Sequence, residues 1–159
     1  MNHYTAIGYP LGISKAPDNT IAFCLETQQG MVFLTLDEFH AWTRFVSQSI
    51  PEPFPAEHAA SLEAKGALLC ARSRSDWENA LQQCQAVRQG YSAIDESGHF
   101  IISLAEKKHT LTPLQFKLWL CADGIQHLST GIFQLFLDQD EKWPEAICSL
   151  MAKELLFLR

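Results

Sequence analysis

The apolar and polar positions of the chain follow one pattern that occurs twice. Residues 34–42 and 111–119 each place a phenylalanine five positions, and a tryptophan eight positions, after a leucine. The two aromatic residues of each copy are three positions apart, so they lie on one face of a predicted helix. We therefore expect four aromatic side chains to anchor the core: Phe39, Trp42, Phe116 and Trp119.

Each copy also begins with a helix-start signal. Thr35 is followed three positions later by Glu38, and Thr112 is followed at the same spacing by Gln115. In such a capping box the threonine side chain accepts a hydrogen bond from a free backbone N–H, and the Glu or Gln side chain reaches back to the threonine N–H. Pro113 suits the first helical position, which needs no N–H donor. The sequence thus predicts a helix after each threonine.

Strand-forming runs lead into the first helix. Residues 4–34 combine β-prone apolar runs with glycine and proline turns, which favours strands. A second helix is expected from Pro55 or Ala56 to Lys65, with Gly66 as its C-cap, before a short buried strand.

Two segments are predicted to act as connectors. Residues 50–55 carry three prolines at alternate positions, which favours an extended link; a ligand motif for a proline-reading domain is the alternative. Ser75 and Glu78 form another capping box, which predicts a helix to about Arg88 between the two units.

The second unit is expected to repeat the first with one more helix. The segments we expect, in order, are a hairpin at 91–104, the Thr112 helix ending at Asp123 and Gly124, helices from Ser129 or Thr130 and from Pro144, and an apolar strand at 155–158.

Motifs at both ends of the units favour an internal duplication. Gly8-Tyr9 resembles Gly90-Tyr91, and 62–65 resembles 150–153. We expect an α+β protein with a first unit at 1–74, a connector helix at 75–89 and a second unit at 90–159. We further expect the units to pack through equivalent faces about a pseudo-two-fold axis, and the last strand to pair inside the second sheet beside Tyr91 to Ile94.

Composition and charge narrow the class of protein. The chain has 159 residues, 47% of them hydrophobic, and a formal net charge of −6, which argues against a general binder of polyanions. Its five cysteines form no CxxC pair, which is typical of reduced thiols in a cytoplasmic protein. We expect neither a signal peptide nor a membrane span.

The repeated stretch resembles a known family. A β-hairpin running into a helix that begins Leu-Thr-x-x-Glu-Phe is similar to the winged-helix effector domain of OmpR/PhoB-type response regulators. The resemblance implies two tandem winged-helix-like units, each a small antiparallel sheet followed by two or three helices and a short strand. The matching residues are Leu34, Thr35, Glu38 and Phe39 in the first copy, and Leu111, Thr112, Phe116 and Leu118 in the second.

The resemblance also implies DNA reading by a basic third helix. Here the matching segment at 144–154 holds Glu145, Lys153 and Glu154, and no arginine. Arginine is the commonest residue that reads bases. The family's terminal two-stranded wing also has no residues left to form it after Arg159.

No catalytic or metal-binding signature occurs in the sequence. None of the six histidines pairs with a histidine, cysteine or carboxylate at a metal-ligand spacing. The serines and cysteines lack nucleophile motifs, and no glycine-rich phosphate loop is present. We therefore expect no enzyme activity, no cofactor and no metal.

The function that these observations favour is a regulatory or adaptor protein that binds an unknown protein partner, with a homodimer as a further expectation. The alternative is a DNA-binding transcription regulator. Its candidate nucleic-acid contacts are five lysines: Lys107, Lys108, Lys117, Lys142 and Lys153.

Overall fold

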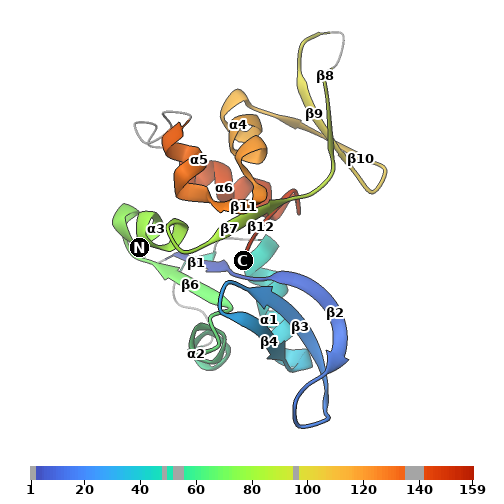
Figure 1. Cartoon of the computed structure of the whole chain (residues 1–159), viewed down its shortest axis with the longest axis vertical. Coiled ribbons are helices and arrows are strands. Elements are labelled where there is room, and N and C mark those ends of the chain that lie inside the picture. Colours follow the sequence, from blue (N-terminus) through green and yellow to red (C-terminus); the bar gives the residue numbers. More distant parts are fainter. Residues whose placement is uncertain (1–2, 48–49, 52–55, 95–96, 135–141) are drawn as a thin grey trace.

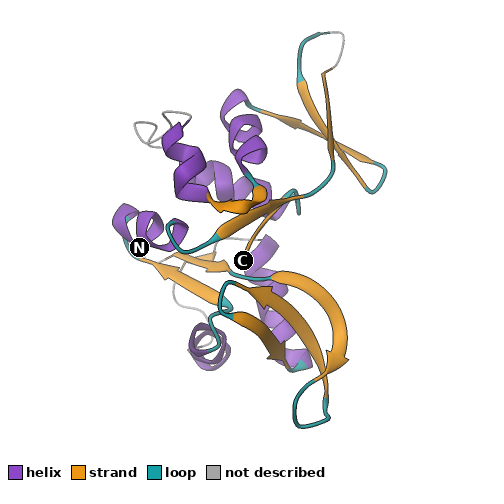
Figure 2. Cartoon of the chain, viewed as in Figure 1, coloured by secondary structure: helices purple, strands orange, loops and turns teal. Residues whose placement is uncertain are grey.

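The computed structural model describes residues 3–47, 50–51, 56–94, 97–134 and 142–159. Within these residues the chain has six helices and four three-stranded sheets, and every strand pair is antiparallel. Figures 1 and 2 display the helices and the small sheets side by side. The prediction of an α+β protein with small antiparallel sheets is confirmed.

The first half contains two sheets and two helices. Its hairpin sheet has the order β2-β3-β4, and its second sheet has the order β5-β1-β6. The elements are β1 (His3–Ala6), β2 (Tyr9–Lys15), β3 (Ile21–Thr27), β4 (Gly30–Leu34), α1 (Leu36–Ser47), β5 (Ile50–Pro51), α2 (Ala56–Ala64) and β6 (Leu68–Ala71). The expected alternating-proline link falls partly on 52–55, which lie outside the described residues.

The second half repeats this order of elements. Its sheets have the orders β8-β9-β10 and β11-β7-β12, which match the first half strand for strand. Helix α3 (Arg74–Leu81) precedes it, and α5 (Leu128–Gln134) has no counterpart among the described residues of the first half. The other elements are β7 (Gln85–Arg88), β8 (Tyr91–Ile94), β9 (Phe100–Leu104), β10 (Lys107–Leu111), α4 (Pro113–Cys121), β11 (Asp123–His127), α6 (Trp143–Ala152) and β12 (Leu156–Leu158).

The two tryptophans of the repeated stretch make the same contact. The Trp42 Nε1–H donates to the Ile7 carbonyl at 3.0 Å, and the Trp119 Nε1–H donates to the Gln89 carbonyl at 2.9 Å. Both tryptophans are buried. Because Ile7 and Gln89 each precede a Gly-Tyr pair, the bonds join equivalent corners of the two halves.

The two phenylalanines of the repeated stretch are also placed alike. Phe39 stacks on Phe23 with ring centroids 4.1 Å apart, and Phe116 stacks on Phe100 at 4.3 Å. Both Phe39 and Phe116 are half-buried against the core rather than fully enclosed. The stack ties the first helix of each half to the central strand of its hairpin sheet.

Both helix-start signals form complete capping boxes. Glu38 accepts from the Thr35 N–H at 2.8 Å, and the Thr35 hydroxyl accepts from the Glu38 N–H. Thr112 and Gln115 exchange the same two bonds. Local side-chain chemistry thus fixes the beginnings of α1 and α4.

The halves pack through elements that are not equivalent. Helix α1 contacts α6, the Gly8 N–H donates to the Leu158 carbonyl at 2.6 Å, and Tyr9 meets Phe157 edge to face. The expected pseudo-two-fold packing of equivalent faces is therefore wrong. The physical reason is that β12 ends against the β1–β2 corner, whereas its counterpart β6 continues into α3. One hydrophobic core runs through both halves.

Three predicted segments differ in the structure. The connector helix is capped by Ser73 and Asp76 rather than by Ser75 and Glu78, and it ends at Leu81 rather than near Arg88. Gln85–Arg88 is instead the central strand β7, paired on both sides. The last strand pairs with β7 in the sheet β11-β7-β12 rather than beside Tyr91–Ile94 in the hairpin sheet. Residues Asp123–His127, expected only to end the Thr112 helix, form β11.

Candidate functional site

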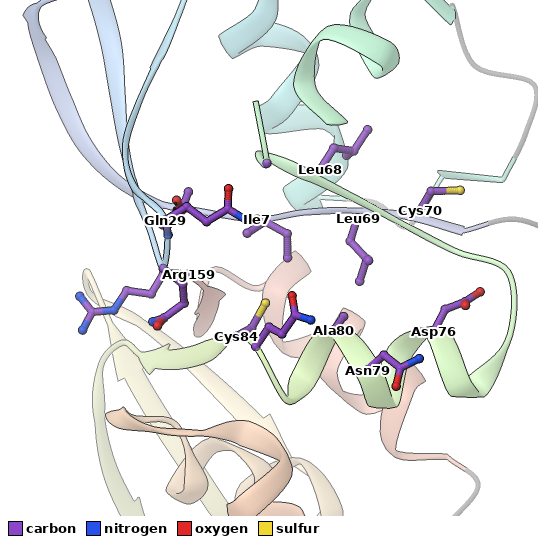
Figure 3. A pocket seen from close by; sticks show the side chains of 14 residues that line it. Ile7, Gln29, Leu68, Leu69, Cys70, Asp76, Asn79, Ala80, Cys84 and Arg159 are labelled. Atoms are coloured by element: carbon purple, nitrogen blue, oxygen red, sulfur yellow. Dashed lines mark hydrogen bonds between the residues drawn. The ribbon is translucent and has the colours of Figure 1, made fainter. Parts of the chain in front are cut away.

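A hollow of about 400 Å³ lies between β6, α3 and the turn that joins β3 to β4. We call it the first hollow. Figure 3 shows Ile7 and Leu69 extending toward the helix that carries Asn79 and Ala80. Gln83, in the turn that follows α3, also lines it.

The backbone beside the first hollow belongs to an edge strand. Strand β6 pairs with β1 on one side, and no strand pairs with its other side in the part of the chain that the structure describes. An edge of this kind presents N–H and C=O groups that can pair with another extended segment. Leu68, Leu69 and Cys70 of this strand all line the hollow.

The charged side chains at the first hollow are already engaged within the protein. Asp76 caps α3 and accepts from the Arg72 and Ser73 N–H groups; the Arg72 bond is the main cause of its lowered pKa. Arg159 pairs with Glu26 and donates to the Gly124 carbonyl. The remaining polar lining is mostly neutral amide, which suits the backbone of a peptide better than an ion.

Of the two cysteines that line the first hollow, Cys84 is poorly suited to act as a nucleophile at neutral pH. Burial raises the pKa of Cys84 to about 11, so the thiolate is scarce. Burial also raises the pKa of Cys121 in the second half, with Asp123 adding to the effect.

The second half has a hollow of about 540 Å³ at the equivalent place. We call it the second hollow. It lies between the β9–β10 turn and the segment that enters β12. Its lining includes Gln89, Leu104 and Phe157, which occupy the positions of Ile7, Thr27 and Leu69 in the first hollow. The ionisable side chains that line the second hollow are those of Lys107, His109, Lys153 and Glu154.

The C-terminal ends of α2 and α6 have the same conformation, and each contributes to the lining of its hollow. The Ala67 N–H donates to the Leu62 carbonyl, and the Leu155 N–H donates to the Leu150 carbonyl. These bonds close a Schellman motif, whose next-to-last residue adopts a left-handed conformation. That residue is Gly66 with a φ of 70° in the first half and Glu154 with a φ of 58° in the second.

The two halves differ in the state of one equivalent lysine, which lines the hollow only in the second half. Lys65 donates to the Glu38 carboxylate at 2.6 Å and to the Phe33 carbonyl at 3.1 Å. Its counterpart is Lys153, and the counterpart of Glu38 is the neutral Gln115. Neither Lys153 nor Lys107 has a hydrogen bond or an ion pair within the described residues. The second hollow therefore holds two unpaired ammonium groups.

The Glu38 carboxylate is held in its charged form. Burial alone would raise its pKa, but hydrogen bonds from Lys65, Ser61 and the Thr35 N–H outweigh burial and lower the pKa to about 2. Gln115 keeps the capping bond and donates to the Ser149 hydroxyl, which is equivalent to Ser61. The exchange of Glu for Gln thus removes the lysine partner and leaves the other contacts in place.

The structure brings together two of the five lysines that the sequence singled out. Lys107 and Lys153 line the second hollow, whereas Lys108, Lys117 and Lys142 do not. Sequence reasoning missed His109, Phe157 and the whole first hollow. One sequence difference could have pointed to the second hollow: the first copy has Glu38 where the otherwise similar second copy has Gln115.

Metal-ligating side chains do not gather in the described ranges. No group of three or more His, Cys, Asp or Glu residues there could hold a metal ion. No helix in the same ranges is long and apolar enough to cross a membrane.

Comparison with known proteins gives no match. No protein-family model matches the chain, and searches of curated proteins and of solved structures found no significant match.

Proposed function

We propose that this protein is a non-enzymatic adaptor that binds partner proteins, and that the first hollow is a binding site for an extended segment of such a partner. The observation that carries the proposal is the free edge of β6 beside a hollow lined by apolar and neutral polar side chains. An extended peptide can add to a strand edge through backbone hydrogen bonds, while pockets for alternate side chains supply specificity.

The chemistry of the first hollow fits such a segment. Leu69 and Ala80 offer apolar contacts, and the exposed amides of Asn79 and Gln83 can donate to and accept from a peptide backbone. A hollow of about 400 Å³ has room for a few side chains, which is the size range of sites for small ligands and short motifs.

Site-specific photo-cross-linking tests this proposal. A photoreactive amino acid would replace Gln83 in the first hollow or, as a control, the exposed Lys117 on α4, in the cells that naturally contain the protein. We expect a discrete cross-linked protein from position 83 and none from position 117. Ala80→Trp, which fills the hollow, should abolish that product. The same products from both positions, or a product that Ala80→Trp leaves intact, would contradict the proposal.

A winged-helix-like scaffold in each half is part of the proposal. It is supported by the hairpin that runs into a capped helix and by the three-stranded sheet that follows. In both halves the middle strand of that sheet comes from the start of the unit, β1 or β7, instead of from a terminal wing.

Binding to DNA is the second candidate function. The observation that favours it is the convergence of Lys107 and Lys153 at one hollow. Against it, α6 contains no arginine and the chain carries a net charge of −6. We predict weak or no binding to pooled genomic duplex fragments at physiological salt in an anisotropy titration. Sequence-selective binding near 10⁻⁸ M, a typical specific affinity, would instead favour the transcription regulator.

A further inference from the structure

We propose that the second hollow is an anion-binding site that takes the carboxylate side chains of an acidic segment of a partner protein. The proposal rests on the proposed function only in that the ligand belongs to a protein. It concerns a different hollow, with different residues, from the one that carries the proposed function.

The first argument comes from comparing the two halves. The lysine that ends the last helix of each half has the same place in the fold, but only Lys65 has an internal carboxylate partner. In the second half Gln115 takes the place of that carboxylate, while it keeps the helix cap and the serine contact. The change therefore leaves the scaffold unaltered and gives the hollow an unpaired positive charge on Lys153.

The second argument comes from the residues that β10 adds. Lys107 and His109 are two positions apart on this strand, so their side chains leave the same face. Both line the second hollow together with Lys153. The equivalent positions in the first half are Gly30 and Val32, which carry no charge and do not line the first hollow. Two ammonium groups and an imidazole thus converge in a protein whose net charge is −6.

The third argument identifies an acidic protein segment as the occupant. Leu104 and the half-buried ring of Phe157 lie beside the cationic groups. A free phosphate would use only the charges, whereas a segment with acidic and apolar side chains would use both. The hollow holds about 540 Å³, which is far more than one small anion fills. The lysines are point charges without the planar fork of arginine, so they impose no phosphate geometry.

One acidic residue of the described chain opposes the ligand. Glu154 lines the second hollow and holds a left-handed backbone that costs a non-glycine residue energy. Its counterpart Gly66 has neither the charge nor the strain. Glu154 should therefore weaken anion binding, and its removal offers a gain-of-binding test.

The probes are fluorescein-labelled peptides in an anisotropy titration of the full chain. The acidic probe has glutamates on both sides of one phenylalanine, and the matched probe has glutamines instead. We expect saturable binding of the acidic probe that weakens as salt is added, and no binding of the glutamine probe. Millimolar inorganic phosphate should not displace the acidic probe.

Four variants locate the site. The double variant Lys107→Gln/Lys153→Gln should weaken binding of the acidic probe about tenfold or more. The control Lys117→Gln, which removes one positive charge at an exposed position of α4, should alter binding less than about twofold. Gln115→Glu, which returns an internal partner to Lys153, should also weaken binding, and Glu154→Gly should strengthen it. Because Lys107 and Lys153 have no partners within the described residues, their variants are expected to fold, and melting curves check this.

Several results would overturn the assignment. Equal binding by the double variant and by Lys117→Gln would place the acidic probe elsewhere. Full displacement by inorganic phosphate would make the site a small-anion site. Tighter binding of a labelled DNA duplex, lost in the double variant, would make it a nucleic-acid site. If the acidic probe fails while the cross-links from Gln83 persist, the second hollow loses its assignment and the adaptor function stands.

Discussion

Replacing Glu38 by Gln tests how much the ion pair between Glu38 and Lys65 contributes to stability. The second half has the neutral Gln115 at the equivalent position. Gln115 is the natural version of this variant, and it keeps the capping bond to Thr112 and a bond to Ser149. We therefore expect Glu38→Gln to keep the equivalent bonds to Thr35 and Ser61. The loss should be confined to the charged contact with Lys65.

The magnitude follows from the pKa of Glu38. Its lowering to about 2, from an ordinary 4.5, corresponds to about 3 kcal/mol of folding free energy at neutral pH. The Lys65 side chain is 36% exposed, so solvent screens part of the attraction. Other hydrogen bonds that contribute to the shift survive in the Gln variant. We therefore expect a destabilisation of roughly 1–2 kcal/mol.

The sign of the pH dependence gives the sharper test. Because folding lowers the pKa of Glu38, its contribution is complete above about pH 4.5 and is lost as the pH falls toward 2. The free energy of unfolding of the wild type and of Glu38→Gln, measured by urea titration, should therefore differ most at neutral pH. Near pH 2.5 the difference should fall to less than half.

A double-mutant cycle with Lys65→Met assigns the effect to the ion pair. If Lys65 is the partner, its replacement should cost little more once Glu38 is Gln. A difference below about 0.5 kcal/mol at neutral pH, or an equal difference at neutral and acid pH, would refute this account of the pair.

Three further predictions concern stability. Trp119→Ala should cost roughly 3–5 kcal/mol in a urea titration, because the indole is buried and its N–H pairs with the Gln89 carbonyl; a loss below about 1 kcal/mol would remove Trp119 from the core. Glu154→Gly should stabilise the protein by roughly 1 kcal/mol, because glycine adopts the left-handed helix ending without strain, and an unchanged or lower melting temperature would contradict this. Deleting residues 155–159 should unfold or aggregate the protein, because β12 pairs with β7 and its leucines are buried; a soluble product with an unchanged melting temperature would contradict this.

Local signals correctly predicted where α1 and α4 begin. The capping boxes at Thr35 and Thr112 depend on residues three positions apart, so the sequence contains the whole determinant. The mixed α+β class followed from the same reasoning, because strand runs and capped helices alternate along the chain.

Long-range pairing explains the segments that the sequence misjudged. Gln85–Arg88 becomes a strand because β11 and β12 pair with its two sides, and those partners lie some 40 to 70 residues further along the chain. Trp77, Leu81 and Cys84 are spaced so that they would share one face of a longer helix, but α3 ends at Leu81 and Cys84 is a buried thiol beyond it. No local sequence rule distinguishes a helix that continues to Arg88 from a shorter helix that is followed by a strand.

The sequence did not predict the hollows, because they too depend on contacts between segments that are far apart along the chain. The first hollow exists because α3 lies beside β6 and the β3–β4 turn reaches the same place, and three separate segments must be positioned before it forms. Its residues form no recognisable sequence motif, and the proposed binding of a peptide would use the backbone of β6, which has no sequence signature.

The equivalent positions that line the two hollows differ in chemistry between the halves. The Phe and Trp of the first helix and one Leu of the last helix are the same in both halves, whereas other buried positions differ in size, as Ala41 and Leu118 do. Positions that face the hollows differ in polarity or size, although their backbone geometry is the same. Two hollows that bind different segments, as proposed, would account for this difference in lining. The exchanged positions are Ile7 and Gln89, Thr27 and Leu104, Gly66 and Glu154, and Leu69 and Phe157.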